Sequence, residues 1–212
     1  MAAYRQKNVS VCQVHQTLVK RQAKARKEKH MTSDDWEKQV LDFWFTDLTA
    51  EDWFTRKDST DATIRERFLS LHRALQTDVP AAAYAEANAA LAAIIMFDQF
   101  PRNMFRGTAE AFSTDTIAVA IARNAVERAF DTSVGPDRRT FFYMPFMHSE
   151  VLADQERCIS LFAEAGSDTK HAVEHRDIIQ KFGRFPHRNR ALGRESTQAE
   201  LAFLGEHEGF GQ

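Results

Sequence analysis

Residues 91–108, LAAIIMFDQFPRNMFRGT, decide the fold because an apolar helical pattern runs directly into a segment rich in arginine. Leu91, Ile94 and Ile95 recur at the spacing of one face of an α-helix, which predicts a buried helix. Asp98 extends the same face, so we expect its carboxylate to point inward. Because an unpaired carboxylate is costly in that position, we expect arginines of the following segment to be its partners.

The segment that begins at Asp98 has a second copy of its residue order later in the chain. Residues 98–108 read DQFPRNMFRGT, and residues 183–197 read GRFPHRNRALGREST. Each passes through Phe-Pro, then Arg-Asn, and then a glycine beside arginine with a threonine after it. The shared order predicts two long polar connectors between helices, and we expect both connectors to converge on one cleft.

The rest of the chain is helical in pattern from Ser33 onward. Apolar residues recur at helical spacing within residues 36–44, 64–75, 115–129, 151–162 and 168–182. Pro80, whose fixed φ suits the first turn of a helix, predicts a helix that runs to Asp98. These spacings are those of amphipathic helices with one buried face.

Two capping boxes support this reading. Thr49-x-x-Asp52 and Thr197-x-x-Glu200 each place a hydroxyl residue three positions before a carboxylate, as at the start of a helix. No alternating pattern typical of strands competes with the helical one. We therefore predict an all-α fold, an antiparallel array of about seven to nine helices in a single domain over residues 33–208.

Four sequence motifs carry a resemblance to a known family. They are Val40–Phe45, Asp98–Asn103 with Arg106–Thr108, Phe142–Glu150, and His175–Ile179 with Gly183–Asn189. Through them the chain resembles, over residues 36–204, the family called Domain of Unknown Function 924. The resemblance implies an all-helical superhelix like that of tetratricopeptide-repeat (α-solenoid-type) proteins, found mainly in bacteria, with no established activity. The tetratricopeptide repeat itself, of about 34 residues, is not legible here.

Composition limits the class of protein. The chain has 212 residues, of which 43% are hydrophobic, and this is enough for one sizeable core. It contains no apolar run of about 18 residues, so we expect no membrane-spanning helix. The two cysteines, Cys12 and Cys158, match neither a metal-binding spacing nor a disulfide framework. This favours a reducing compartment, and we expect a cytoplasmic protein.

Charge is distributed unevenly along the chain. Residues 1–30 carry eight Lys/Arg and a single acid, and we predict that residues 1–32 form a disordered basic extension or precede a natural start at Met31. A cleaved transit peptide is the alternative, and it would place the protein in an organelle. Residues 31–212 carry 20 basic and 29 acidic residues, a net charge of −9. A domain this acidic binds phosphate backbones poorly, so we expect no nucleic-acid partner.

The two connectors contain the candidate ligand-binding residues. These are Asp98, Arg102, Asn103, Arg106, Arg184, His187, Arg188, Asn189 and Arg194. Planar guanidinium groups beside helix N-termini suit a carboxylate or phosphate ligand. Alternatively, the arginines clamp the connectors by binding carbonyl and carboxylate groups of the protein. The interpretations differ in whether the guanidinium donors are all satisfied by the protein or open into a pocket.

His148, Glu150 and His175 are the candidates for acid–base catalysis, because a carboxylate can tune the pKa of a nearby histidine. A buried histidine with a backbone or carboxylate partner is the simpler interpretation of His175. Residues 171–175, HAVEH, match the H-x-x-E-H pattern of a class of zinc peptidases. No third ligand is evident, and the family resemblance points to His175 and not to His171. We therefore expect no metal and no cofactor.

Two classes of function remain open from the sequence. We favour a helical binding module whose partner is a small anionic ligand, either a carboxylate or a phosphate. The alternative is a tetratricopeptide-like scaffold with a protein partner, in which the arginines are structural. An enzyme that uses His148 and His175 is a third possibility, and the sequence offers no obvious nucleophile for it.

Overall fold

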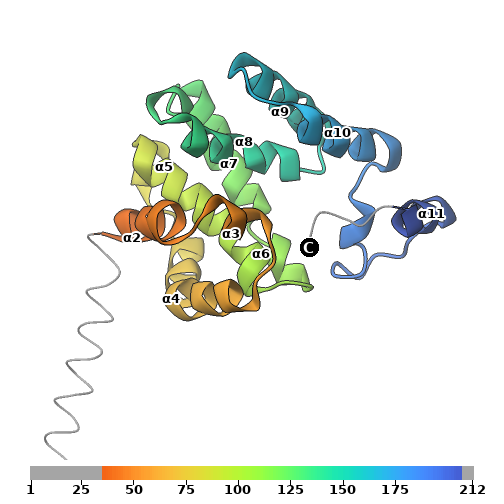
Figure 1. Ribbon diagram of the computed structural model, residues 1–212, viewed down its shortest axis with the longest axis horizontal. Helices are drawn as coiled ribbons and strands as arrows, with labels where there is room; N and C mark the ends of the chain where they lie inside the picture. The colour runs from red at the N-terminus through yellow and green to blue at the C-terminus, as the bar shows by residue number, and fades with distance from the viewer. Residues whose placement is uncertain (1–34, 207–212) are drawn as a thin grey trace, which may run out of the picture. The chain divides into compact units, whose positions relative to one another are not determined.

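Every regular element that the structure describes is a helix. The computed structural model describes residues 35–206 (Figure 1). No strand occurs within that range, which confirms the all-α class. No helix within it is both long and apolar enough to span a membrane. The tetratricopeptide-like superhelix and the domain limits remain predictions, and the predicted basic extension, residues 1–32, lies outside the described residues.

The helices follow one another through short turns. In chain order the α-helices are α2 (Trp36–Asp42), α3 (Ala50–Phe54), α4 (Asp58–Thr77), α5 (Ala87–Ile94), α6 (Phe100–Met104), α7 (Asp115–Glu127), α8 (Pro136–His148), α9 (Leu152–Glu164), α10 (Lys170–Phe182) and α11 (Gln198–Glu206). Between them lie the π-helical segments η1 (Phe43–Asp47) and η3 (Ile95–Gln99) and the 3₁₀ turns η2 (Ala81–Tyr84), η4 (Ala109–Phe112), η5 (Asp131–Ser133) and η6 (Pro186–Arg188).

Helix α5 lies at the centre of the core. Every residue from Ala89 to Phe97 is fully buried. Helices α7 and α8 pack directly against α5, and α4 packs against α6. Four of the nine buried residues are alanines, whose small side chains let neighbouring helices approach closely. Burial on all sides explains why this helix is apolar around its whole circumference.

Residues 98–104 are helical, so the prediction that a connector begins at Asp98 is wrong. The chain passes from α5 through η3 into α6, and the backbone N–H of Phe100 donates to the carbonyl of Ile95, five residues earlier. This wider π turn shifts the hydrogen-bond register just before Pro101, which has no N–H to donate. The proline is therefore tolerated near the start of α6. Arg102 therefore lies on a helix and not on a loop.

The helix predicted from Pro80 to Asp98 is also interrupted. Pro80 precedes the 3₁₀ turn η2, and α5 begins only at Ala87. The proline does set the start of a helical turn, as expected, but the turn is not continued into α5.

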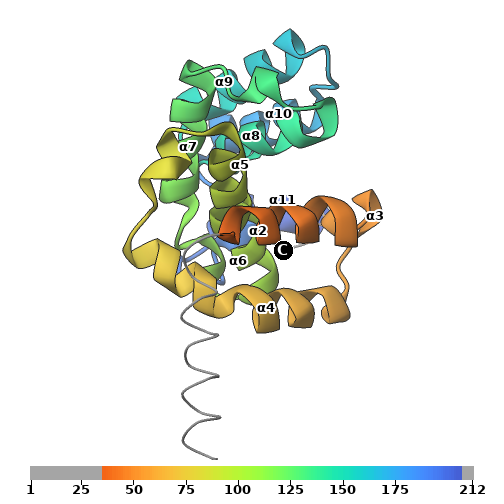
Figure 2. The ribbon, with the colours of Figure 1, turned by 90° about the vertical axis from the view of Figure 1, so that its left-hand side faces the viewer.

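Aromatic side chains join the N-terminal helices to the core. The ring of Phe100 lies 4.7 Å from that of Phe68 in α4 and 5.6 Å from that of Trp44. Trp44 in turn contacts Phe141 of α8, with ring centroids 5.7 Å apart. On the other side of α8, α9 packs against it and α10 against α9. Helices α9 and α10 thus lie at the opposite end from α4 (Figure 2).

The second connector, residues 183–197, is an irregular segment that contains one short 3₁₀ turn. Gly183 ends α10 with φ +70°, a left-handed conformation that favours glycine. At the other end the predicted capping box is confirmed: the N–H of Thr197 donates to Glu200 Oε2 at 2.7 Å, and the N–H of Glu200 donates to Thr197 Oγ1 at 3.2 Å. The box at Thr49 and Asp52 is confirmed as well.

Candidate functional site

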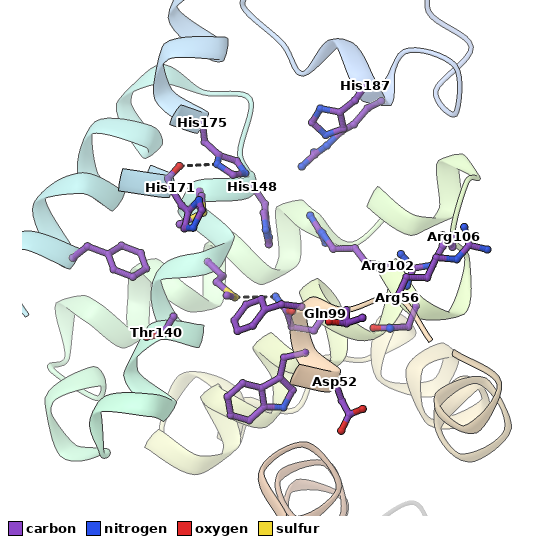
Figure 3. A pocket seen from close by; sticks show the side chains of 18 of the residues that line it. Asp52, Arg56, Gln99, Arg102, Arg106, Thr140, His148, His171, His175 and His187 are labelled. Carbon is purple, nitrogen blue, oxygen red and sulfur yellow. Dashed lines mark hydrogen bonds between the residues drawn. The ribbon is translucent and has the colours of Figure 1, made fainter. Parts of the chain in front are cut away.

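Residues of both arginine-rich segments line one cavity of about 520 Å³. Helix α6 contributes Arg102 and Asn103, and η6 contributes His187 and Arg188. Side chains of α3, α8 and α10 complete the wall, so that four histidines and several arginines surround the same space (Figure 3). The two segments therefore approach each other in space, as their shared residue order predicts.

Asp98 is fully buried and is not among the residues that line the cavity, which confirms its predicted inward direction. Its main partner is His148 at the end of α8, whose Nδ1 lies 2.8 and 2.9 Å from the two carboxylate oxygens. Gln99 Nε2 donates to Asp98 Oδ2 at 2.5 Å. Arg102 Nη1 lies 3.3 Å from the carboxylate and donates to the backbone carbonyl of Asp98. The expectation of arginine partners was thus incomplete, because a histidine and a glutamine both approach the carboxylate more closely than Arg102 does.

The surroundings of this pair fix its protonation state. Burial acts to raise the pKa of Asp98, but Arg102 and His148 outweigh it and hold that pKa below its ordinary value. Burial also lowers the pKa of His148, against the opposing effect of Asp98. Asp98 is therefore ionised and His148 neutral at neutral pH. A neutral imidazole that donates Nδ1–H to a carboxylate keeps its lone pair on Nε2.

Two arginines share one further carboxylate. Arg102 binds Asp115, at the first position of α7, through two parallel hydrogen bonds of 2.9 and 3.1 Å. Arg188 donates to the same carboxylate through Nη1, at 3.2 Å. The buried group thus contains two guanidinium cations, Arg102 and Arg188, and two carboxylates, Asp98 and Asp115. Their charges balance when His148 is neutral.

The Arg188 guanidinium is buried but only partly hydrogen-bonded. Its carbon Cζ lies 4.6 Å from the ring centroids of both Phe112 and Phe185, so the cation contacts two aromatic rings. The hydrogen bond to Asp115 is its single one within residues 35–206, and Nε is buried without a partner. Burial, reinforced by the charge of Arg102, lowers the pKa of Arg188 to about 10. Arg188 is still charged at neutral pH and has unused donors.

Comparison with known proteins identifies the family of this chain. A family model described as a bacterial protein of unknown function, DUF924, matches residues 40–208. The chain belongs to the DUF924 family. It is also similar to the solved structure of a protein of unknown function from Agrobacterium tumefaciens, with 39% sequence identity and a TM-score of 0.78 over 82% of this chain and 100% of that one. No protein with a curated description matches.

Besides Asp98, three of the predicted ligand-binding residues lie outside the cavity wall of this DUF924 chain. Arg184 binds Glu200 through hydrogen bonds of 2.7 and 2.9 Å, and Arg194 binds Glu150 through bonds of 2.7 and 2.9 Å. Asn189 joins Arg194 to the connector by accepting from its Nε at 3.0 Å. These side chains clamp the second connector, as the alternative interpretation predicts. Their guanidinium groups are bound by carboxylates of α11 and of the α8–α9 turn.

Two further predicted residues line the cavity but are held by the protein. Arg106 donates to Asp61 of α4 through Nε at 2.8 Å and Nη2 at 3.0 Å, and Asn103 donates to the same carboxylate at 2.8 Å. This cluster joins α6 to α4. Glu150, a candidate for acid–base catalysis, is likewise engaged: besides Arg194 it accepts from the N–H of Phe185 at 2.8 Å. Its carboxylate therefore acts as a structural anchor.

The other histidines of the DUF924 cavity differ in their surroundings. His175 is buried, and its Nδ1–H donates to the carbonyl of His171 at 2.7 Å, which is the simpler of the two predicted roles. Burial, reinforced by the neighbouring His148, lowers the pKa of His175 to about 3. His171 is exposed, and its Nδ1 lies 3.0 Å from Glu174. Within residues 35–206 no three His, Cys, Asp or Glu side chains are grouped as metal ligands.

Asp115 and Gln99 are the site residues that the sequence did not indicate. Asp115 begins a helix, where an acidic side chain is already explained by the helix dipole. Gln99 follows Asp98 in the π-helical segment η3, and its side chain points as that helix requires. The nearby Pro101 made the sequence predict a connector there instead of a helix. Both residues act through partners distant in the chain, and no local pattern marks such a pairing.

Proposed function

We propose that the cavity binds a small organic anion, a carboxylate or a phosphate, through the guanidinium group of Arg188. The observation that carries the proposal is the unused donor capacity of this buried group: a guanidinium has five N–H donors, and Arg188 has a single hydrogen bond within the described residues. A buried donor without a partner costs free energy, which an anion at this position would recover.

The unequal sharing of Asp115 supports an anion as the ligand. Arg188 shares Asp115 with Arg102, which already makes two hydrogen bonds to that carboxylate. Asp115 therefore compensates Arg188 only in part. A bound carboxylate or phosphate would complete the hydrogen bonding of Arg188.

The lining also indicates what the remainder of the ligand is like. Trp53, Met144, Met147 and Phe162 face the same cavity as Arg188. An anion bound by Arg188 would therefore have an apolar part that lies against these side chains. A cavity of about 520 Å³ accommodates a ligand of metabolite size.

Thermal unfolding with a panel of carboxylates and phosphates tests the proposal. We expect the melting temperature of the wild-type protein to rise with apolar carboxylates such as phenylacetate or butyrate, or with their phosphate counterparts. A ligand at one hundred times its Kd adds about 2.7 kcal/mol to the free energy of unfolding. Arg188→Gln should keep the fold and lose the ligand-dependent rise.

Arg194 provides the matched control, because it is an arginine of the same connector that lies outside the cavity wall. Arg194→Gln breaks the clamp on Glu150, so we expect a lower melting temperature without ligand and an undiminished rise with ligand. The opposite pattern, with Arg188→Gln strongly destabilised and no compound stabilising the wild type, would contradict the proposal and favour the scaffold.

A further inference from the structure

We propose that the same cavity is the active site of an esterase, in which the Asp98–His148 pair activates a water molecule to cleave a carboxylic ester. This inference rests on the proposed binding function, since the anion that Arg188 binds would be the carboxylate product. The substrate class is an ester of a small acid with an apolar acyl chain.

The geometry of Asp98 and His148 is that of a held general base. His148 donates Nδ1–H to the fully buried carboxylate of Asp98, which fixes both the tautomer and the ring direction. Gln99 and Arg102 hold the carboxylate in turn. The proposed base is Nε2, on the ring edge opposite Nδ1, because His148 lines the cavity while Asp98, which binds Nδ1, does not. Nε2 makes no hydrogen bond to any other group within residues 35–206.

Burial and two nearby arginines keep His148 in the basic form. Asp98 from η3 faces its Nδ1, and Arg102 of α6, Arg188 of η6 and His175 of α10 also lie near it. Burial and the two arginines lower the pKa of His148, while Asp98 opposes them. The imidazole is thus neutral at neutral pH and able to accept a proton.

Water is the nucleophile that this cavity favours. No serine or cysteine is among the described residues that line it, and neither of its threonines, Thr55 and Thr140, is hydrogen-bonded to His148. The remaining cysteine of the folded part, Cys158, lies outside the wall, and burial raises the pKa of its thiol to about 12. A positioned base without a thiol or serine beside it acts on water or on the ligand itself.

The reaction then follows in two balanced steps. His148 Nε2 takes one proton from water as the water oxygen bonds to the acyl carbon, and the carbonyl electron pair moves onto its oxygen. The tetrahedral intermediate collapses when the bond between carbon and the alkoxy oxygen breaks. That oxygen takes the proton from Nε2 and leaves as the alcohol. The carboxylic acid loses its proton to solvent and becomes the carboxylate.

Arg188 stabilises the charge that develops in the intermediate. Arg188 lines the cavity, and its guanidinium cation would interact more strongly with an oxyanion than with the neutral ester carbonyl. Contacts with the rings of Phe112 and Phe185 hold the guanidinium in place before the substrate binds. Product carboxylate and oxyanion make the same contact, which explains why one arginine serves both binding and catalysis.

Hydrolysis of p-nitrophenyl butyrate by the full chain tests the inference. We expect saturable turnover by the wild type and a loss of roughly 10²-fold or more in kcat for His148→Asn. His72→Leu is the control: this histidine lies on α4, outside the cavity wall, has no part in the proposed step, and its replacement should leave the rate unchanged. Asp98→Asn should lower kcat and move the midpoint of the pH–rate profile to lower pH, because Asp98 raises the pKa of His148.

Binding of butyrate separates the two proposals. His148→Asn should still be stabilised by butyrate, since Arg188 remains. If butyrate and the rest of the panel leave the wild type unstabilised, and no ester is cleaved, the binding function itself is wrong. If butyrate stabilises the wild type but no ester is cleaved, the binding function stands and the esterase is overturned. The same holds if His148→Asn cleaves the ester as fast as the wild type, or if mass spectra show an acyl group bound to the protein.

Discussion

Replacing His72 with leucine should stabilise the protein most strongly in mildly acidic solution. His72 lies on α4, fully buried, and both ring nitrogens are without hydrogen-bond partners. Its ring is 5.9 Å from that of Phe97 and 5.8 Å from that of Phe105. Burial, reinforced by Arg73, lowers the pKa of His72 to about 4. The folded protein therefore resists protonation at this position.

The sign and size of the effect follow from this pKa. An unfolded chain binds a proton at His72 below a pH of about 6.5, whereas the folded chain does so only near pH 4. Stability is thus lost as the pH falls between these two values. Between pH 7 and pH 5 the loss from this one histidine is roughly 1–2 kcal/mol after allowance for screening. Leucine at this position removes that pH-dependent loss of stability. It also removes the cost of burying two unpaired ring nitrogens, which is about 1–3 kcal/mol.

Urea unfolding of the wild type and His72→Leu at pH 7 and pH 5 measures both quantities. We expect the variant to have the higher midpoint at pH 7 and a larger advantage at pH 5. His175 also has a lowered pKa, so the wild type and the variant both lose stability on acidification, and the difference between them isolates His72. Equal pH dependence of the two proteins would refute the reasoning, because it would mean that His72 is protonated equally in the folded and unfolded states.

Two further predictions concern the second connector. Glu150→Gln should lower the free energy of unfolding by roughly 1–3 kcal/mol, because it removes the charge that compensates Arg194. Chemical denaturation should detect this loss, and carboxylates should still stabilise the variant. Gly183→Ala should cost about 1 kcal/mol because the φ of +70° is strained for any residue with a Cβ, although open space surrounds the position; an unchanged melting temperature would contradict this.

Helix content was predictable because helices are marked by local sequence patterns, namely apolar residues at helical spacing and capping residues at the ends. The apolar stripe of Leu91, Ile94 and Ile95 indicated a buried helix, and the capping box at Thr197 indicated the start of another. The path around Pro101 was not predictable in the same way. A proline ordinarily ends a helix, and a π turn that changes the hydrogen-bond register before it has no simple signal in residue order.

The candidate site was predictable only as a set of residue types. The same stripe placed Asp98 inside, but its partner His148 is fifty residues away, at the end of a helix that packs on η3. Arginines of the second connector looked alike in the sequence. Whether each becomes a clamp or faces the cavity depends on which carboxylate reaches it: Glu200 binds Arg184, whereas Arg188 obtains one oxygen of a carboxylate already bound by another arginine.

The repeated Phe-Pro and Arg-Asn order acquires a physical meaning from this arrangement. Phe100 and Phe185 are both fully buried, so each copy anchors its segment in the core by an aromatic ring. The arginine that follows in each copy, Arg102 or Arg188, then reaches the same carboxylate, Asp115. Arg102 lies on the α-helix α6 and makes two parallel hydrogen bonds to Asp115, whereas Arg188 ends the 3₁₀ turn η6 and makes one. A single carboxylate cannot satisfy both guanidinium groups equally. The unequal sharing leaves donor capacity on Arg188, in the cavity that His148 also lines.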